Sequence, residues 1–105
     1  SIMKKLLLSI AFLAAAGIGA EQIKPDCTYK GIRLYGRVKI VDSWEHVRVR
    51  ITGSWENLRV QKVSSWPNSC GKWEFVDSWE DFRVKFVDSW EDFTISYTEN
   101  SPGLR

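Results

Sequence analysis

Two cysteines, Cys27 and Cys70, are the residues of this 105-residue sequence with the clearest covalent chemistry. A pair of cysteines in a small domain that carries an export signal, such as the one described below, usually forms a disulfide. With some 43 residues between them, the bond would stabilise the fold by about 4 kcal/mol in the chain-entropy model. Two independent buried thiols are the alternative. We predict a Cys27–Cys70 disulfide, which would leave no thiolate nucleophile.

The other residues that could act in catalysis are one histidine and two groups of carboxylates. His46 occupies the repeat position that Asn57, Asp81 and Asp92 fill in other copies, so we predict a solvated turn residue and not a general base. The acidic clusters around Asp81 and Asp92 lack the alternate-oxygen spacing and the glycine of a calcium loop. Carboxylate pairs for glycoside hydrolysis need a cleft that so short a repeat is not expected to build. We therefore predict no catalytic residues, no metal ligands, no cofactor and no enzymatic activity.

Tryptophan is the most unusual component, with six copies in the sequence. Five follow a serine at regular spacing and are the candidate binding residues: Trp44, Trp55, Trp66, Trp79 and Trp90. Evenly spaced indoles could form a stacking surface for sugar rings or peptides, because an indole combines an apolar face with a polar edge. The same residues share the parity of the apolar strand residues before them, which favours the core. We predict that they are mainly core, and that Trp73 is also internal.

The Ser-Trp dipeptides recur at steps of 11, 11, 13 and 11 residues, which defines an 11-residue repeat with one two-residue insertion. The second half of each unit alternates strictly, as in 47–51 and 82–86, which is typical of a half-buried strand. The first half is polar and rich in turn-forming Asp and Ser. The insertion is at 67–70 and contains Cys70. We predict an all-β single small domain of six to seven 11-residue strand-plus-turn repeats.

Charge limits how these strands can be arranged. In a parallel, in-register stack, one basic residue of each unit would form a continuous ladder, and like charges in direct opposition destabilise a sheet. Neighbouring strands are therefore expected to be antiparallel, offset or interleaved. Residues 30–62 hold eight basic and three acidic groups, and 63–105 hold four and eight. This division favours association of the two halves, although solvated surface charge explains it as well.

The N-terminus has the layout of a secretory signal peptide. Met3, Lys4 and Lys5 precede an uncharged apolar segment, which ends in small residues before Glu21. An uncleaved membrane anchor is the alternative, but a spanning helix needs roughly 20 apolar residues. We predict a signal peptide at 1–20, an N-terminal segment at 21–29 and a tandem β-repeat domain at 30–105, with the protein in the periplasm or secreted.

Cleavage there would leave a neutral chain. Without Lys4 and Lys5, 13 of the 15 basic groups remain, equal to the 13 acidic groups. Non-specific nucleic-acid binding depends on excess positive charge. We therefore expect no nucleic-acid partner, no stable membrane anchor after cleavage, and a monomer whose partner the sequence does not identify.

The repeat FVDSWEDFRVKFVDSWEDF at 75–93, with its interruption at Ser-Cys-Gly-Lys-Trp, resembles the septoil-knot family of short bacterial repeat proteins. The resemblance covers 29–105. It implies strands that alternate with acidic, aromatic turns in a knotted or interleaved chain, and it implies no activity and no functional residue.

These observations favour an exported non-enzymatic scaffold with a binding or structural role. Two alternatives remain: a surface-assembling β protein that resembles a fibre subunit, and a Trp-mediated carbohydrate or peptide binder. Charged residues on every strand disfavour assembly by edge-to-edge stacking.

Overall fold

The structure, a computed structural model, describes residues 22–105, so the predicted signal peptide at 1–20 lies outside the described residues. Nine strands and no helix are present in this part of the chain, which confirms the all-β prediction. The strands are β1 (Thr28–Tyr29), β2 (Ile32–Arg33), β3 (Gly36–Ile40), β4 (Val47–Ile51), β5 (Leu58–Lys62), β6 (Lys72–Phe75), β7 (Phe82–Phe86), β8 (Phe93–Tyr97) and β9 (Gly103–Leu104). No helix long and apolar enough to cross a membrane occurs between residues 22 and 105.

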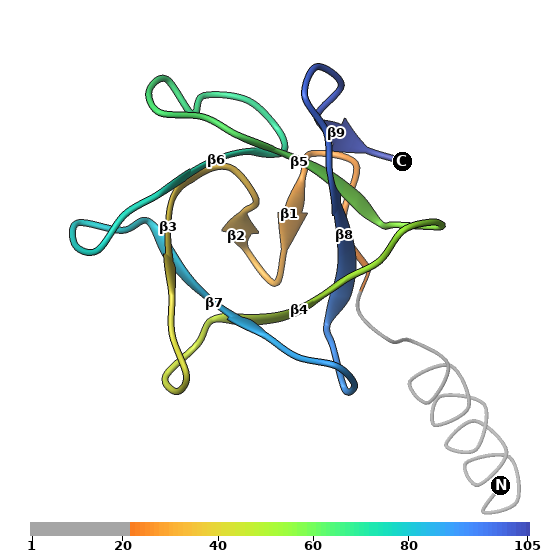
Figure 1. The fold of residues 1–105 in the computed structure, drawn as a ribbon, viewed down its shortest axis with the longest axis horizontal. Coiled ribbons are helices and arrows are strands. Elements are labelled where there is room, and N and C mark those ends of the chain that lie inside the picture. The colour runs from red at the N-terminus through yellow and green to blue at the C-terminus, as the bar shows by residue number, and fades with distance from the viewer. Residues whose placement is uncertain (1–21) are drawn as a thin grey trace, which may run out of the picture.

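Six strands form a closed, parallel barrel in the order β6-β3-β7-β4-β8-β5, and β5 pairs with β6 to complete the ring (Figure 1). All pairings within this ring are parallel. Among the strands of residues 22–105, the antiparallel pairs are β1 with β2 and β9 with β5. Closure matters because a barrel of this kind leaves none of its six strands with an open edge.

The two halves of the chain alternate around the ring. Strands β3, β4 and β5 come from the first half, and each gap between them is filled by a strand of the second half. An 11-residue step advances the chain by two places. The 13-residue step from β5 to β6 advances it by one, so the second pass enters the gaps that the first pass left. The two-residue insertion within 67–70 therefore determines which gaps of the ring the strands of the second half enter.

Interleaving is one of the arrangements expected from the charges, whereas the antiparallel alternative is wrong for the barrel. Each basic strand of the first half has neighbours from the acidic second half, and Arg37 lies opposite Glu74. Interleaving does not remove every like-charge pair, since Lys39 lies opposite Arg83. The glutamates of the turns contribute the compensating charge, as described below.

The core is built in layers because neighbouring strands are staggered. Val38 pairs with Phe82, for example, and Ile40 with Val84. The stagger brings equivalent residues of all six strands to one level along the barrel axis. The central layer has no exposed surface and consists of Val38, Val49, Val60, Trp73, Val84 and Ile95. The layer nearer the strand starts contains Val47, Leu58, Phe82 and Phe93, which are exposed by 4% or less.

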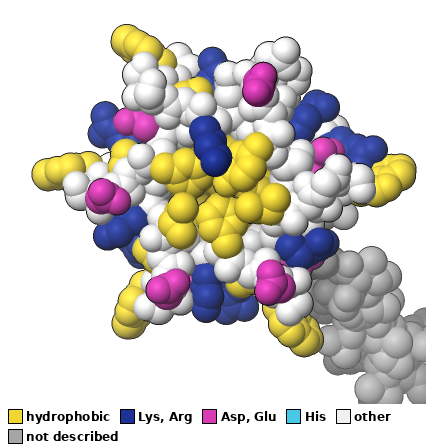
Figure 2. All heavy atoms as spheres, viewed as in Figure 1, with side chains coloured by type: hydrophobic (Ala, Val, Ile, Leu, Met, Phe, Trp, Pro, Cys, Tyr) yellow, Lys and Arg dark blue, Asp and Glu magenta, His cyan; other side chains and the backbone are white. Residues whose placement is uncertain are grey.

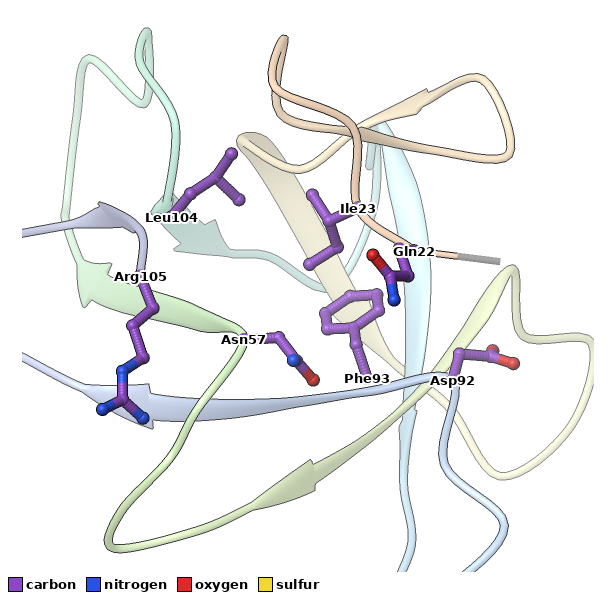
Figure 3. A pocket seen from close by; sticks show the side chains of 7 residues that line it. All are labelled: Gln22, Ile23, Asn57, Asp92, Phe93, Leu104 and Arg105. Atoms are coloured by element: carbon purple, nitrogen blue, oxygen red, sulfur yellow. The ribbon is translucent and has the colours of Figure 1, made fainter. Parts of the chain in front are cut away.

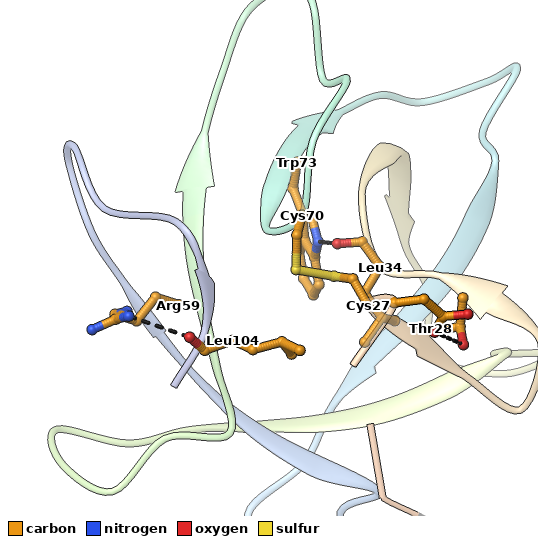
Figure 4. The surroundings of a disulfide bond; sticks show 8 residues. Cys27, Thr28, Leu34, Arg59, Cys70, Trp73 and Leu104 are labelled. Carbon is orange, nitrogen blue, oxygen red and sulfur yellow. Dashed lines mark hydrogen bonds between the residues drawn. A yellow bond between two sulfur atoms is a disulfide. The ribbon is translucent and has the colours of Figure 1, made fainter. Parts of the chain in front are cut away.

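The N-terminal hairpin closes the end of the barrel where the strands begin. Figure 1 shows β1 and β2 within the outline of the ring, and the Tyr29 ring lies 5.4 Å from that of Phe93. The indole N–H of Trp73 donates to the Leu34 carbonyl at 3.0 Å, which confirms that Trp73 is internal (Figure 4). A Cys27–Cys70 disulfide ties this hairpin to the inserted turn, with the two Cα atoms 5.8 Å apart, and so confirms the predicted bond.

Candidate functional site

The five repeat tryptophans lie at the tips of the turns and are exposed by 79–86%. The prediction that they belong to the core is therefore wrong. Each has a left-handed backbone conformation with φ between 58° and 64°. Side chains alternate between the two faces of a strand only while the chain is extended. Because Trp55 has a left-handed conformation, its side chain does not lie on the same side as that of Ile51, although the spacing of the two residues predicted that it would.

Figure 1 shows these turns projecting from the barrel as separate arms, and Figure 2 shows apolar side chains at arm tips. The arms between successive barrel strands carry one tryptophan each, namely Trp44, Trp55, Trp66, Trp79 and Trp90. The turn at 98–102, between β8 and β9, carries none. Among the cations of residues 22–105, one lies over a tip indole: the Arg105 guanidinium is 4.2 Å from the centre of the Trp55 ring. The indoles thus form a ring of separate exposed groups that face in different directions.

A glutamate follows four of the five tryptophans, and its carboxylate returns to the barrel wall. Glu91 forms an ion pair with Arg50 at 3.1 Å, and Glu45 forms one with Arg48 at 3.0 Å. A main-chain hydrogen bond at Glu91 itself and the Arg50 guanidinium hold the pKa of Glu91 below its ordinary value. Glu45, Glu56 and Glu80 have lowered pKa values as well. These carboxylates therefore serve to anchor the arms.

In four of the five turns, the residue two positions after the tryptophan anchors the turn to the neighbouring strand through two hydrogen bonds. The Asp92 main-chain N–H donates to the Arg48 carbonyl at 2.8 Å, and the Asp92 carboxylate accepts from the Arg48 N–H at 2.7 Å. His46 makes the same pair of bonds with Arg83, with its Nδ1 accepting at 2.8 Å.

Asp81 and Asn57 form the equivalent bonds with Arg37 and Thr94. His46 is exposed, as predicted for a turn residue, but its ring has a structural role that sequence reasoning missed. A signal was present, because aspartate, asparagine and neutral histidine all offer a hydrogen-bond acceptor close to the main chain.

Several of the groups considered for catalysis are therefore engaged in holding the barrel together. Both cysteines are in the disulfide, and His46 and Asp92 accept main-chain hydrogen bonds. No cluster of three or more potential metal-ligating side chains occurs among residues 22–105. A cavity of about 400 Å³ lies beside Phe93, between the start of the described chain and its C-terminus (Figure 3). Its lining includes Asn57 and Asp92, whose side chains are already bonded to the main chain.

Comparison with known proteins identifies the fold. The family model described as the 7(1) septoil knot domain matches residues 31–105. A comparison with curated proteins gave no match.

Proposed function

We propose, from the premise that the chain belongs to the septoil knot domain family, that it is an exported, non-enzymatic binding module. Its contact sites are the five tip tryptophans, and its ligands are carbohydrates or peptides. The barrel acts as a rigid support that holds the five indoles at fixed positions.

The exposure of the indoles carries this proposal. A tryptophan that is 86% exposed, as Trp79 is, contributes little to the core. Its left-handed conformation is one that glycine adopts without the steric cost that other residues incur. Stability alone therefore does not require tryptophan at the tip. Contact with a partner explains tryptophan better, because its large rigid face stacks on sugar rings and peptide groups.

Export is supported by two independent features. The disulfide between Cys27 and Cys70 is consistent with an oxidising compartment, and the basic and apolar N-terminal pattern is typical of a signal peptide. We place the protein in the periplasm or outside the cell.

The fibre alternative is less well supported than a monomeric module. Fibre growth by strand addition requires an open strand edge. Strands β3 to β8 each have a neighbour on both sides, since β5 pairs with β6 and closes the ring.

A glycan and peptide array probed with the oxidised protein tests the proposal. We expect the protein to bind at least one ligand class. A variant in which all five tip tryptophans are replaced by glycine should lose that binding and remain folded. The matched control replaces the serine before each tryptophan by alanine, and it should bind normally. Equal binding by the protein and the glycine variant would contradict the proposal.

A further inference from the structure

The end of the barrel opposite the N-terminal hairpin is apolar and uncovered. Because the six strands are parallel, their last residues lie at this end. We call these six residues the end face: Ile40, Ile51, Lys62, Phe75, Phe86 and Tyr97. Ile40 is 53% exposed, Ile51 52% and Tyr97 38%. Figure 2 shows an apolar patch at the centre of the molecule, with one basic side chain across it.

A ring of acidic side chains surrounds this patch. Four of the six strands carry an exposed acid two residues after the end face, and we call these the acidic rim: Asp42, Asp77, Asp88 and Glu99. Two residues of extended chain span at most about 7 Å, so each carboxylate lies close to the apolar patch. None of the four is in an ion pair with any other residue of 22–105. The rim carboxylates therefore lack the ion-pair partners that the glutamates of the arms have within the described chain, and the end face itself carries one basic residue, Lys62.

The end face itself shows how it accommodates a cation. The Lys62 ammonium lies 4.3 Å from the centre of the Tyr97 ring. Phe75 and Phe86 occupy equivalent positions on the other two strands of the second half, and no cation from the described chain lies over either ring. An aromatic face attracts an ammonium or guanidinium group, and more strongly when water is excluded.

We infer that the end face and the acidic rim form a docking site for a cationic amphipathic peptide segment, distinct from the tryptophan tips. Apolar side chains of the segment would cover Ile40 and Ile51. Its lysine or arginine side chains would reach the carboxylates of the rim and the rings of Phe75 and Phe86.

Charge distinguishes this partner from the other candidates for an apolar surface. A second copy stacked end to end would bring two acidic rims together, and like charges across an interface disfavour association. An anionic membrane surface would be repelled in the same way. A cationic segment is attracted by the same rim, and its apolar side chains bury the exposed isoleucines.

Fluorescence anisotropy with labelled synthetic peptides tests the inference on the oxidised protein as isolated. The probe is a peptide of alternating leucine and lysine. One comparison peptide replaces lysine by glutamate, and the other replaces leucine by serine. We expect the leucine–lysine peptide to bind at least about tenfold more tightly than either, and its binding to weaken as salt concentration rises.

Two variants locate the binding. Ile40→Lys/Ile51→Lys places lysine where β5 already has Lys62, so the fold should tolerate it, and binding should weaken by about tenfold or more through repulsion. Asp42→Asn/Asp88→Asn removes half of the rim and should weaken binding by about two- to tenfold. The control, Ser54→Lys/Ser65→Lys, adds the same two units of charge on the two exposed turns that carry no rim acid, and it should bind nearly as well as the unmodified protein.

Circular dichroism in denaturant verifies that each variant is folded, and a substitution that unfolds the protein is replaced by Ile51→Ser alone. Equal binding by the isoleucine variant and the control would overturn the inference. So would equal binding of the leucine–glutamate peptide. Sedimentation that shows a dimer which Ile40→Lys/Ile51→Lys separates would assign the face to a second copy. Flotation with anionic or zwitterionic vesicles that the same variant abolishes would assign it to a membrane.

Discussion

Trp73 and Trp79 are six residues apart in sequence, and we predict opposite effects on stability when each is replaced. Trp79→Gly should change the free energy of unfolding by no more than about 1 kcal/mol in either direction, because the indole is 86% exposed. The small buried part, about one seventh of a residue that buries at most some 250 Å² when fully enclosed, contributes roughly 1 kcal/mol. Relief of the left-handed conformation returns about 1 to 2 kcal/mol, and the flexibility of glycine removes about 0.5 to 1 kcal/mol.

Trp73→Ala removes a side chain with no exposed surface. Truncation of a buried tryptophan costs about 3 to 5 kcal/mol. The Leu34 carbonyl loses its indole donor but still accepts from the Gly71 main-chain N–H at 3.1 Å, so it is not left unsatisfied. A small domain has about 5 to 15 kcal/mol of stability in total, so this variant should be close to unfolding.

Equilibrium unfolding in guanidinium chloride, followed by far-ultraviolet circular dichroism, measures both effects on the oxidised protein. Circular dichroism is preferred because the substitutions alter the tryptophan fluorescence. Samples must be incubated until the unfolding and refolding curves coincide. A loss of more than about 2 kcal/mol in Trp79→Gly would refute the reasoning, because it would mean that the tip indole stabilises the fold.

Three further predictions concern the bonds that hold the barrel together. Replacing Cys27 and Cys70 by alanine should lower the free energy of unfolding by about 4 kcal/mol, because the bond closes a loop of 43 residues, and chemical denaturation against the oxidised parent measures the loss. Asp92→Ala leaves the Arg48 N–H without its acceptor and should cost about 1 to 2 kcal/mol, whereas Asp92→Asn keeps an acceptor and should cost less; equal losses would contradict the role of the side chain. The lowered pKa of Glu91 means that its contribution is complete above its ordinary pKa of 4.5 and is lost as the pH falls through the lower folded value, so a pH series should show less acid sensitivity in Glu91→Gln than in the parent.

The strands and the disulfide could be predicted from the sequence because their signals are local or nearly unique. The apolar and polar alternation at 47–51 and 82–86 matches β4 and β7, and two cysteines allow only one intramolecular pairing. Trp73 could be predicted because it stands at an inward position within a strand.

The tips and the strand order could not be predicted in the same way. The positive φ of Trp55 is held by hydrogen bonds to a segment that is distant in sequence, such as those between Asn57 and Thr94, which are 37 residues apart. The parallel order depends on which gaps of the ring the strands of the second half enter. The length of the insertion influences this position, but the position cannot be read from that length alone. The destabilising effect of like charges on neighbouring strands was overestimated. Lys39 lies opposite Arg83 on the solvated outer wall of the barrel, where exposed charges interact weakly.

Interleaving also limits how such a protein can change its size. In a stacked repeat array each unit contacts only its sequence neighbours, so units can be gained or lost one at a time. Here a turn is bonded to a strand 37 or 44 residues away, and a strand that is lost leaves a gap between two strands of the other pass. Deletion of one 11-residue unit would therefore open the barrel instead of shortening it. Repeat number in this architecture is fixed by ring closure, and change is confined to the turns that project from it.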